Sequence, residues 1–354
     1  MNDRKSHPFI SRRQLLRTAA GSVALAAPAL IFPNRARAAD SLVFVGYGGT
    51  TQQLQEQVYV KPFMKETGIQ VVSATGVDLA RLRAMVTTGN LEWDVVNFAG
   101  VAGYSAGNAG LLEPLDYSVI DTSDMLLKPT SSVVPLYSYF AGIAYNPTKT
   151  PAGKYPTSYA EFWDVQKFPG KRSLRSDPNE ILELALMADG VAPKDLYPLD
   201  VDRAFKSLDR IKPHVLKWGN SQDAITLLQR NEVAFSYAFG GRVFAMKSQG
   251  VPMDIHKKAN VITPGVLTIP KGSKKRDLAM KFIAYWMRPE KQAEYCAVQG
   301  GYSPSKRAAL PLLTPEARDM QPDVDDPATI VTDLQYWADN YEKIGIRYRE
   351  WLLT

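Results

Sequence analysis

Apolar runs and helix-like segments alternate along most of this 354-residue chain. The apolar residues 42–45 end in a glycine-rich turn, which predicts a short buried strand. A helical pattern follows over residues 52–67, then a second strand over 69–72, a helix over 79–88 and a third strand over 94–98. Strands and helices that alternate in this way within about sixty residues predict a doubly wound parallel sheet of the α/β class.

A second α/β unit follows a proline-rich stretch. Residues 133–146 predict a strand that runs into Pro147, Pro151 and Pro156, the best candidate for a linker. Beyond it we expect strands at 171–175, 215–218, 233–239 and 266–269, and helices at 180–188, 202–211, 221–230, 242–249, 278–287, 290–298 and 328–351. Two such units predict a cleft, because ligands of open α/β sheets bind beyond the carboxyl ends of the strands.

The first 38 residues have the pattern of an export signal. Basic residues precede an apolar run over residues 19–32, and the small residues of positions 36–38 (Ala-Arg-Ala) predict signal-peptidase cleavage after Ala38. Residues 11–17 (Ser-Arg-Arg-Gln-Leu-Leu-Arg) match the twin-arginine signal of the Tat translocase. A basic amphipathic helix is the alternative. We expect Tat export to the periplasm, without a lipid anchor at the N-terminus, because the only cysteine is Cys296.

The charge balance changes once this segment is set aside. The full chain has 42 Lys and Arg against 36 Asp and Glu, a net charge of +6, which alone favours a nucleic-acid or anionic-membrane ligand. Seven of the basic residues and one of the acidic residues precede Ala39, so the remainder has 35 of each and no net charge. A nucleic-acid partner is therefore not expected. A single cysteine also excludes a disulfide framework.

Catalytic and metal-binding alternatives rest on few residues. Gly103-Tyr-Ser-Ala-Gly107 fits the G-x-S-x-G motif of α/β-hydrolases with Ser105 as nucleophile, although the motif does not follow directly on a core strand. Tyr137 and Tyr139 could bind Fe(III), but they are alternate residues of a predicted strand, and a structural role is preferred for them. His214 and His256 lack the spacing of metal ligands. We expect a protein that is not an enzyme and has no cofactor or metal site.

The candidate ligand groups lie in loops that follow predicted strands. Backbone N–H groups of the glycine-rich loop 46–51 suit a carboxylate. Asp177 and Glu180 open a helix, where either carboxylate can cap the helix or pair with an amine in the cleft. Arg242 can clamp a ligand carboxylate or lie along a helix surface. The predicted ligand-binding residues are Tyr47, Gly49, Thr50, Thr51, Phe98, Ser176, Asp177, Glu180, Trp218, Phe239, Arg242, Thr263 and Tyr302.

Seven short motifs follow one another between residues 47 and 273. They are Tyr47-Gly-Gly-Thr-Thr-Gln52, Lys61-Pro-Phe-Met-Lys-Glu-Thr-Gly68, Glu92-Trp-Asp-Val-Val96, Leu111-Leu-Glu-Pro-Leu-Asp116, Phe168-Pro-Gly-Lys-Arg172, Asp200-Val-Asp-Arg-Ala-Phe205 and Ile269-Pro-Lys-Gly-Ser273. In this order the chain resembles the solute-binding proteins of ABC importers, in the spermidine/putrescine-type branch. The resemblance implies a type II periplasmic-binding fold, with two α/β lobes, a multi-crossover hinge and docking to an ABC permease of the inner membrane. The expected organisation is a signal peptide at 1–38, one lobe at 39–140 plus 262–301, and a second lobe at 141–261 plus 302–354.

The same resemblance bears on the ligand. Asp177 and Glu180 fall where polyamine-binding relatives have amine-pairing carboxylates, and Phe239 falls where they have a stacking Trp. Two acids of that pattern are replaced, by Thr50-Thr51 in the first loop and by Thr263-Pro264-Gly265 before the last strand. A long polyamine needs a carboxylate near each end, because an unpaired buried ammonium is costly. We therefore expect a monomeric carrier of a small amine or a zwitterion, polyamine-like or amino-acid-like.

Overall fold

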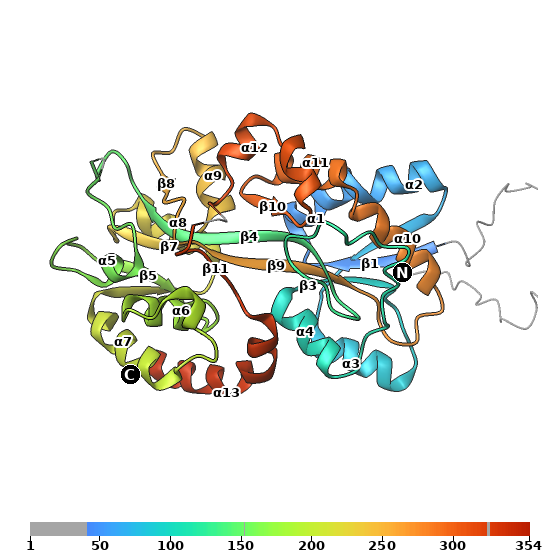
Figure 1. The fold of residues 1–354 in the computed structure, drawn as a ribbon, viewed down its shortest axis with the longest axis horizontal. Coiled ribbons are helices and arrows are strands. Elements are labelled where there is room, and N and C mark those ends of the chain that lie inside the picture. Colours follow the sequence, from blue (N-terminus) through green and yellow to red (C-terminus); the bar gives the residue numbers. More distant parts are fainter. Residues whose placement is uncertain (1–40, 152, 324–325) are drawn as a thin grey trace, which may run out of the picture. The chain divides into compact units, whose positions relative to one another are not determined.

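The computed structural model describes residues 41–151, 153–323 and 326–354 of the chain (Figure 1). The predicted signal peptide, with its twin-arginine motif and the cleavage site after Ala38, lies outside the described residues. From Ala39 on, the chain forms one compact unit. This unit is built around a β-sheet with helices on its faces (Figure 1).

One sheet runs through the unit. Its main path is, in order, β2 (Gln70–Thr75), β1 (Ser41–Gly46), β3 (Val95–Ala99), β9 (Val261–Thr268), β4 (Val134–Tyr145), β7 (Phe235–Phe239), β5 (Arg172–Arg175) and β6 (Val215–Trp218). Three short strands lie off this path. They are β8 (Asp254–Ile255) and β10 (Tyr302–Pro304), which pair with β4, and β11 (Ile330–Val331), which pairs with β9.

The strands of this sheet do not all run in the same direction, although the parallel arrangement predicted for residues 42–98 is confirmed in β1, β2 and β3. β1 pairs in parallel with β2 and β3, and β5 pairs in parallel with β6 and β7. Between these two groups, β9 runs antiparallel to β3 and to β4, and β4 runs antiparallel to β7. The parallel groups are the two predicted α/β units, and β4 and β9 connect them.

Both connecting strands are shared by two hydrophobic cores. The first core includes Phe44, Phe63, Leu136, Leu267 and Trp286. The second core includes Ile143, Leu182, Tyr237, Ile262 and Trp337. A smaller third core, with Val45, Leu82, Trp93, Phe98 and Val266, covers the opposite face of β1 from the first, because neighbouring strand residues point to opposite faces. Each connecting strand therefore leaves one core and enters another, Leu136 and Ile143 lying on β4 and Leu267 and Ile262 on β9.

The helices begin and end largely where local signals predict. The segment predicted at 52–67 is continuously helical, as α1 (Gly49–Gln55), a π-helical turn (Glu56–Val60) and α2 (Lys61–Thr67). Asp78 caps α3 by accepting a hydrogen bond from the Arg81 amide. The remaining helices are α3 (Leu79–Thr88), α4 (Gly100–Asn108), α5 (Tyr159–Trp163), α6 (Ile181–Ala188), α7 (Val201–Ile211), α8 (Ser221–Gln229), α9 (Gly240–Ser248), α10 (Arg276–Trp286), α11 (Pro289–Gln299), α12 (Pro315–Asp319) and α13 (Leu334–Leu353).

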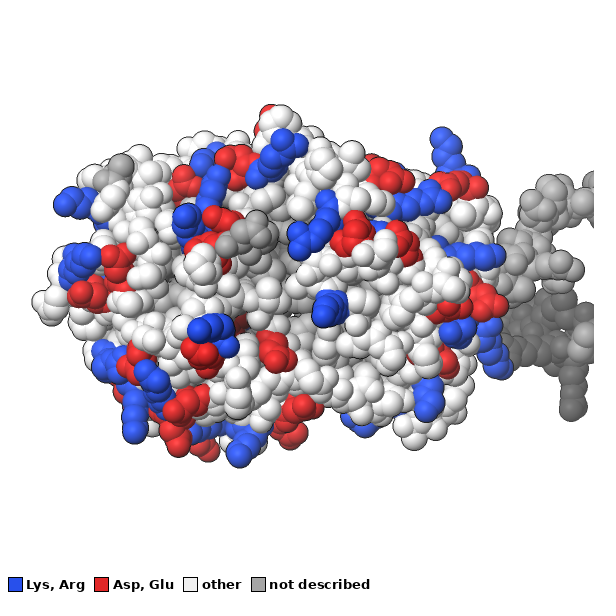
Figure 2. Space-filling model, viewed as in Figure 1, with Lys and Arg blue, Asp and Glu red and all other residues white. Residues whose placement is uncertain are grey.

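The surface of the described residues carries both signs of charge. Figure 2 shows Lys and Arg interspersed with Asp and Glu over one face, without a continuous basic field of the kind that binds nucleic acid. Among the residues that the structure describes, no helix has the length and apolar character needed to cross a membrane.

Candidate functional site

A cavity of about 320 Å³, called here the cleft cavity, lies at the carboxyl ends of β3 and β5. Ligands of open α/β sheets bind at this position. Its walls come from elements that pack on different cores, with β4 and β9 between them. The lining residues are Leu79, Ala99, Gly100, Val101, Ala102 and Ser105 on one side, Arg175, Asp177, Asn179 and Tyr341 on the other, and Tyr139 and Thr263 on the connecting strands.

Arg175, the last residue of β5, brings a cation to the cleft cavity. Its guanidinium nitrogens lie 3.9 Å from Asp177 Oδ2 and 3.9 Å from Glu180 Oε2. Burial opposes the charge, but the Glu180 and Asp177 carboxylates outweigh burial and raise the pKa of Arg175. Within the described part of the chain, no N–H of this guanidinium donates a hydrogen bond of normal length. Its donors are therefore available to a ligand carboxylate, which a guanidinium can bind with two parallel hydrogen bonds.

Asp177 brings an anion to the same cavity. Its Oδ1 accepts a hydrogen bond from the Asn179 amide at 3.0 Å, and its Oδ2 accepts one from Tyr341 Oη at 2.7 Å. The following helix α6 begins without a side-chain cap, so Asp177 does not serve as one. Its side chain is 25% exposed, which leaves room for a ligand ammonium beside the carboxylate.

Glu180 lies beneath the cavity and neither lines it nor caps α6. It is 1% exposed and adopts a left-handed backbone conformation with φ of 75°, which is uncommon for a residue with a side chain. Its carboxylate accepts hydrogen bonds from Tyr237 Oη and Thr263 Oγ1, both at 2.8 Å. Burial raises the pKa of Glu180, and the Arg175 guanidinium opposes that rise. Glu180 therefore contacts Arg175 and Thr263 and does not line the cleft cavity.

Asn179 adds a polar group with an unused hydrogen-bonding atom. The residue is 7% exposed and lines the cleft cavity. Its side-chain oxygen Oδ1 is buried and has no hydrogen-bond partner among the described residues. A buried acceptor without a partner is costly, so a ligand N–H that reached it would remove that cost.

Several predicted aromatic residues surround Arg175 and Tyr139 instead of lining the cavity. The Phe239 ring lies 5.7 Å from Arg175 Cζ and contacts Tyr139 edge-on, with ring centres 5.5 Å apart. Trp218 is buried, packs edge-on against Phe239 at 5.7 Å and donates from Nε1 to the Tyr237 carbonyl. The ring centre of Tyr302 lies 6.4 Å from that of Tyr139. These rings support the cavity wall.

The remaining predicted residues lie outside the cavity lining. Tyr47 Oη accepts a hydrogen bond from the Ala99 amide at 2.9 Å. Gly49, Thr50 and Thr51 form the first turn of α1, and the preceding Gly48 amide donates to Gln52 within the same turn. The Ser176 amide donates to the Trp218 carbonyl, and Phe98 is buried in the third core. Arg242 is exposed and donates to Ser221 Oγ at 3.2 Å, so neither predicted carboxylate site coincides with the cleft cavity.

Sequence reasoning missed most of the cavity lining. Of the predicted residues, Asp177 and Thr263 line it. Arg175 was not among the predicted ligand-binding residues, because it is the last residue of the strand predicted at 171–175. Asn179 lies between two predicted residues and carries no charge to single it out. Tyr341 lies on α13, far along the chain, and no local signal connects it with Asp177.

The catalytic and metal-binding alternatives find no support in this geometry. Ser105 lies within the second turn of α4 rather than at a strand–helix turn, and neither His214 nor His256 lines the cavity with it. Tyr137 is buried in the first core, whereas Tyr139 faces the cavity. Burial raises the pKa of both phenols, which disfavours the phenolate that binds Fe(III). The described residues contain no group of three or more His, Cys, Asp or Glu placed to hold a metal ion.

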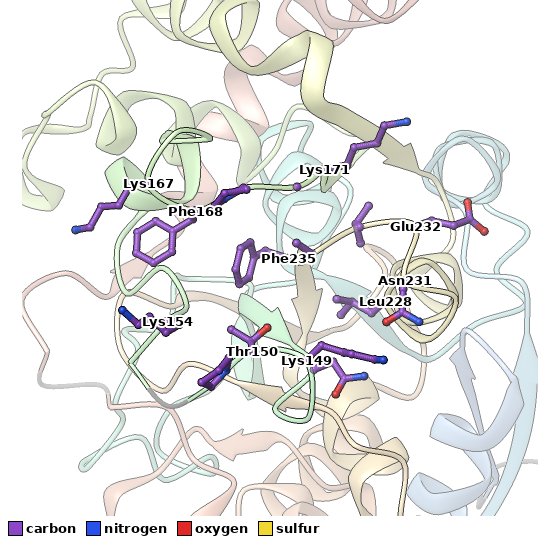
Figure 3. A pocket seen from close by; sticks show the side chains of 16 residues that line it. Lys149, Thr150, Lys154, Lys167, Phe168, Lys171, Leu228, Asn231, Glu232 and Phe235 are labelled. Atoms are coloured by element: carbon purple, nitrogen blue, oxygen red, sulfur yellow. The ribbon is translucent and has the colours of Figure 1, made fainter.

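A second and larger hollow, called here the lysine hollow, has a volume of about 690 Å³ (Figure 3). Phe168, Phe235 and Leu228 line it from the second core, and its rim carries Lys149, Lys154, Lys167 and Lys171. Figure 3 shows the ammonium ends of Lys167 and Lys171 directed away from its centre. Lys167 is also paired with Glu161 at 2.7 Å.

The fold and the cavity at the strand ends are those of a solute-binding protein, and the chain belongs to the family of bacterial extracellular solute-binding proteins. The model of this family matches residues 58–327. The fold is the predicted type II periplasmic-binding fold of the α/β class. The resemblance to periplasmic solute-binding proteins of ABC importers is likewise confirmed.

Individual relatives bind amines or amino-acid-like solutes. A gamma-aminobutyric acid-binding protein of Pseudomonas aeruginosa is 33% identical over 335 residues, which cover 91% of this chain and 94% of that protein. The spermidine/putrescine-binding periplasmic protein of Escherichia coli K12 is 26% identical over 275 residues, 73% of this chain and 78% of that protein. The solved Atu4243–GABA receptor has a TM-score of 0.81 at 36% identity, covering 88% of this chain and 97% of that one. AgtB of Agrobacterium tumefaciens R10, solved with agropinic acid, has a TM-score of 0.73 at 34% identity, covering 89% of this chain and 99% of that one.

Proposed function

We propose that this protein is the periplasmic substrate-binding component of an ABC importer and captures a small zwitterion of the γ-amino acid class. The observation that carries the proposal is the pair of opposite charges, Arg175 and Asp177, on one cavity of about 320 Å³. The relatives named for gamma-aminobutyric acid support the ligand class. The protein acts by binding, and we assign it no catalytic role.

The charges of Arg175 and Asp177 determine the orientation of the ligand in the cleft cavity. The ligand carboxylate pairs with the Arg175 guanidinium, whose donors are unused. The ligand ammonium pairs with Asp177 Oδ2 and comes within reach of the buried Asn179 Oδ1. A long polyamine is disfavoured, because Glu180, the other carboxylate near the cavity, is already occupied by Tyr237 and Thr263. The second ammonium of a polyamine would then be buried without a partner, which is costly.

Capture proceeds by closure of two lobes about the connecting strands. We retain the lobe boundaries of 39–140 plus 262–301 and 141–261 plus 302–354 as part of this proposal. The sharing of β4 and β9 between the first and second cores supports them, since these strands then form the hinge. A ligand that contacts both sides of the cleft cavity binds the closed form better and shifts the population towards it.

Export by the Tat pathway, with cleavage after Ala38, completes the proposal. It rests on the twin-arginine motif at residues 11–17 and on the Ala-Arg-Ala sequence that ends at Ala38. The protein is proposed to work as a monomer that delivers its solute to a permease of the inner membrane. The periplasmic relatives support this location.

A thermal-shift panel tests the ligand class. The purified protein is heated with γ-aminobutyrate, other γ-amino acids, α-amino acids, putrescine, spermidine and simple carboxylates. A γ-amino acid at 100 times its Kd should add about 2.7 kcal/mol to the free energy of unfolding. Stabilisation by purely anionic or uncharged solutes, with none by any zwitterion or amine, would contradict the proposed ligand class.

A further inference from the structure

The C-terminal helix α13 contacts two regions that pack on different cores. Trp337, Ile344 and Tyr348 bury its inner side in the second core. Its N-terminal half lies beside α4, which packs on the third core through Ala106 (Figure 1). The helix therefore bridges the two sides of the cleft cavity.

The helices α4 and α13 approach each other closely at both ends of α4. At the start of α4, a Cβ added to Gly100 would lie 2.7 Å from Leu334 Cδ1, so only glycine fits there without a shift. Val101 of α4 packs against the second core. The two helices thus meet through apolar side chains near the cavity and through polar side chains further out.

The polar contact joins Asn108, the last residue of α4, to Asp339 of α13. Asn108 Nδ2 donates a hydrogen bond to Asp339 Oδ1 at 2.8 Å. Gln335 Nε2, on α13 itself, lies 3.1 Å from each oxygen of the same carboxylate, which holds Asp339 in position. Both Asn108 and Asp339 are exposed, so this contact lies at the outer edge of the cleft and not in the cavity.

The same helix also reaches the ligand-binding charges. Tyr341, two residues after Asp339, donates from Oη to Asp177 Oδ2 at 2.7 Å and lines the cleft cavity. Any movement of α13 away from α4 therefore changes the surroundings of Asp177 as well. The contact with α4 and the position of Asp177, the proposed partner of the ligand ammonium, are mechanically coupled through one helix.

We propose that Asn108 and Asp339 form a latch between α4 and α13 and act as positioning residues that set ligand affinity without touching the ligand. This proposal rests on the proposed function, because it assumes that a ligand is enclosed between the two sides. The hydrogen bond exists only where α4 and α13 are in contact, so it favours the closed form. The apparent affinity for a ligand falls in proportion to the fraction of molecules in the binding-competent form. A weaker latch therefore lowers affinity chiefly by speeding ligand release.

A charge swap across the latch tests it. Asn108→Asp places a second carboxylate opposite Asp339, and the two like charges repel. We expect this variant to bind γ-aminobutyrate about tenfold more weakly, mainly through a faster dissociation rate. The double variant Asn108→Asp/Asp339→Asn again places an amide opposite a carboxylate, with the donor and the acceptor exchanged between the helices. Its affinity for γ-aminobutyrate should be within about twofold of that of wild type. Glu342→Gln, an exposed change on the same helix, is the matched control and should bind as wild type does.

Two outcomes would overturn the latch. One is wild-type affinity in Asn108→Asp, and the other is a double variant that stays as weak as the single one, since a general disturbance of α4 is not repaired by a change on α13. Because both positions are exposed, the variants should fold, and their melting temperatures verify it. If wild type binds no member of the ligand panel, the proposed function fails and the latch is judged without ligand. Small-angle scattering should then give a larger radius of gyration for Asn108→Asp than for wild type and the double variant. Equal radii in all three would refute the latch.

Discussion

The cleft cavity and the lysine hollow differ in how their charges are held. In the cleft cavity, Arg175 and Asp177 are each about three-quarters buried, and Asp177 accepts hydrogen bonds from Asn179 and Tyr341. The lysine hollow has about twice the volume, but its four lysines are all exposed on its rim. A fixed charge in a partly dry site interacts strongly with a ligand, whereas an exposed flexible ammonium is screened by solvent and salt. On this ground we place the proposed ligand site in the cleft cavity rather than in the larger lysine hollow.

The two sites also differ in the parts of the chain that build them. The apolar lining of the lysine hollow, including Phe168, Leu228, Val233 and Phe235, belongs to the second core. The cleft cavity is lined by elements that pack on different cores and by the two strands that connect them. A ligand in the cleft cavity can therefore favour a closed form of the protein, and a ligand in the lysine hollow cannot act in this way.

The largest effect should come from removing the paired charges of the cleft cavity. We expect Arg175→Gln and Asp177→Asn each to weaken γ-aminobutyrate binding by about 3–5 kcal/mol, a loss of roughly two to four orders of magnitude, because each leaves one ligand charge buried without a partner. Titration calorimetry measures both losses. Arg242→Gln is the control, since Arg242 is exposed and bonded to Ser221, and it should change the affinity by less than about twofold.

The two charge variants should also differ from each other in selectivity. Asp177→Asn should discriminate less than wild type between γ-aminobutyrate and butyrate, which lacks the amine. Arg175→Gln should keep the wild-type discrimination between these two ligands. If Arg242→Gln lost as much affinity as Arg175→Gln, the ligand carboxylate would bind at Arg242, as the sequence predicted. The comparison between the cleft cavity and the lysine hollow would then be wrong.

A smaller effect is expected from Glu183 of α6, a buried carboxylate beside the cleft. Its Oε1 accepts hydrogen bonds from Tyr197 Oη at 2.5 Å and from Trp337 Nε1 of α13 at 2.6 Å. Burial raises the pKa of Glu183 from 4.5 to about 7. The folded state then holds a proton that the unfolded state releases between these pH values, so the contribution of Glu183 to stability is highest below pH 4.5 and falls as pH rises to about 7.

The Glu183 effect can be isolated by substitution. The wild-type free energy of unfolding should lose about 3 kcal/mol from this group between the two pKa values. Glu183→Gln keeps an oxygen acceptor for Tyr197 and Trp337 but cannot titrate, so its unfolding free energy should lack that decline. Denaturant unfolding from pH 4 to pH 8 compares the two proteins. Parallel curves would show that Glu183 ionises at its ordinary pKa in the folded protein.

The sequence predicted the elements of the fold better than their directions. Residues 94–98 and 133–146 were expected as strands and are found at Val95–Ala99 and Val134–Tyr145. The directions of β4 and β9 were not predictable, because alternation of apolar side chains looks the same whichever way a strand runs. The hinge position was expected from the family resemblance instead, and it stays part of the proposal.

The candidate site was predictable only where chemistry follows directly on a strand. Asp177 and Thr263 were found by that rule. Glu180 was expected to cap a helix or face the cleft, but its positive φ turns its carboxylate to Tyr237 and Thr263 instead. Tyr341 reaches Asp177 across 164 positions of sequence. Such a contact depends on how α13 packs, which no local pattern encodes.

The smallest effect is expected from substitutions at the lysine hollow, which test whether its exposed charges contribute to binding. Lys149→Gln/Lys171→Gln removes two exposed ammonium groups and leaves the Lys167–Glu161 pair intact. The affinity for γ-aminobutyrate should stay within about twofold of wild type, and the free energy of unfolding within about 0.5 kcal/mol, as for most surface substitutions. Calorimetry and denaturant unfolding measure the two quantities. A tenfold loss of affinity would show that exposed charges around a large hollow can govern binding here. Inorganic phosphate could also stabilise wild type but not this variant. That result would show that the lysines form an anion site, because exposed ammonium groups that are not held around a common point are screened by solvent and salt and do not bind phosphate specifically.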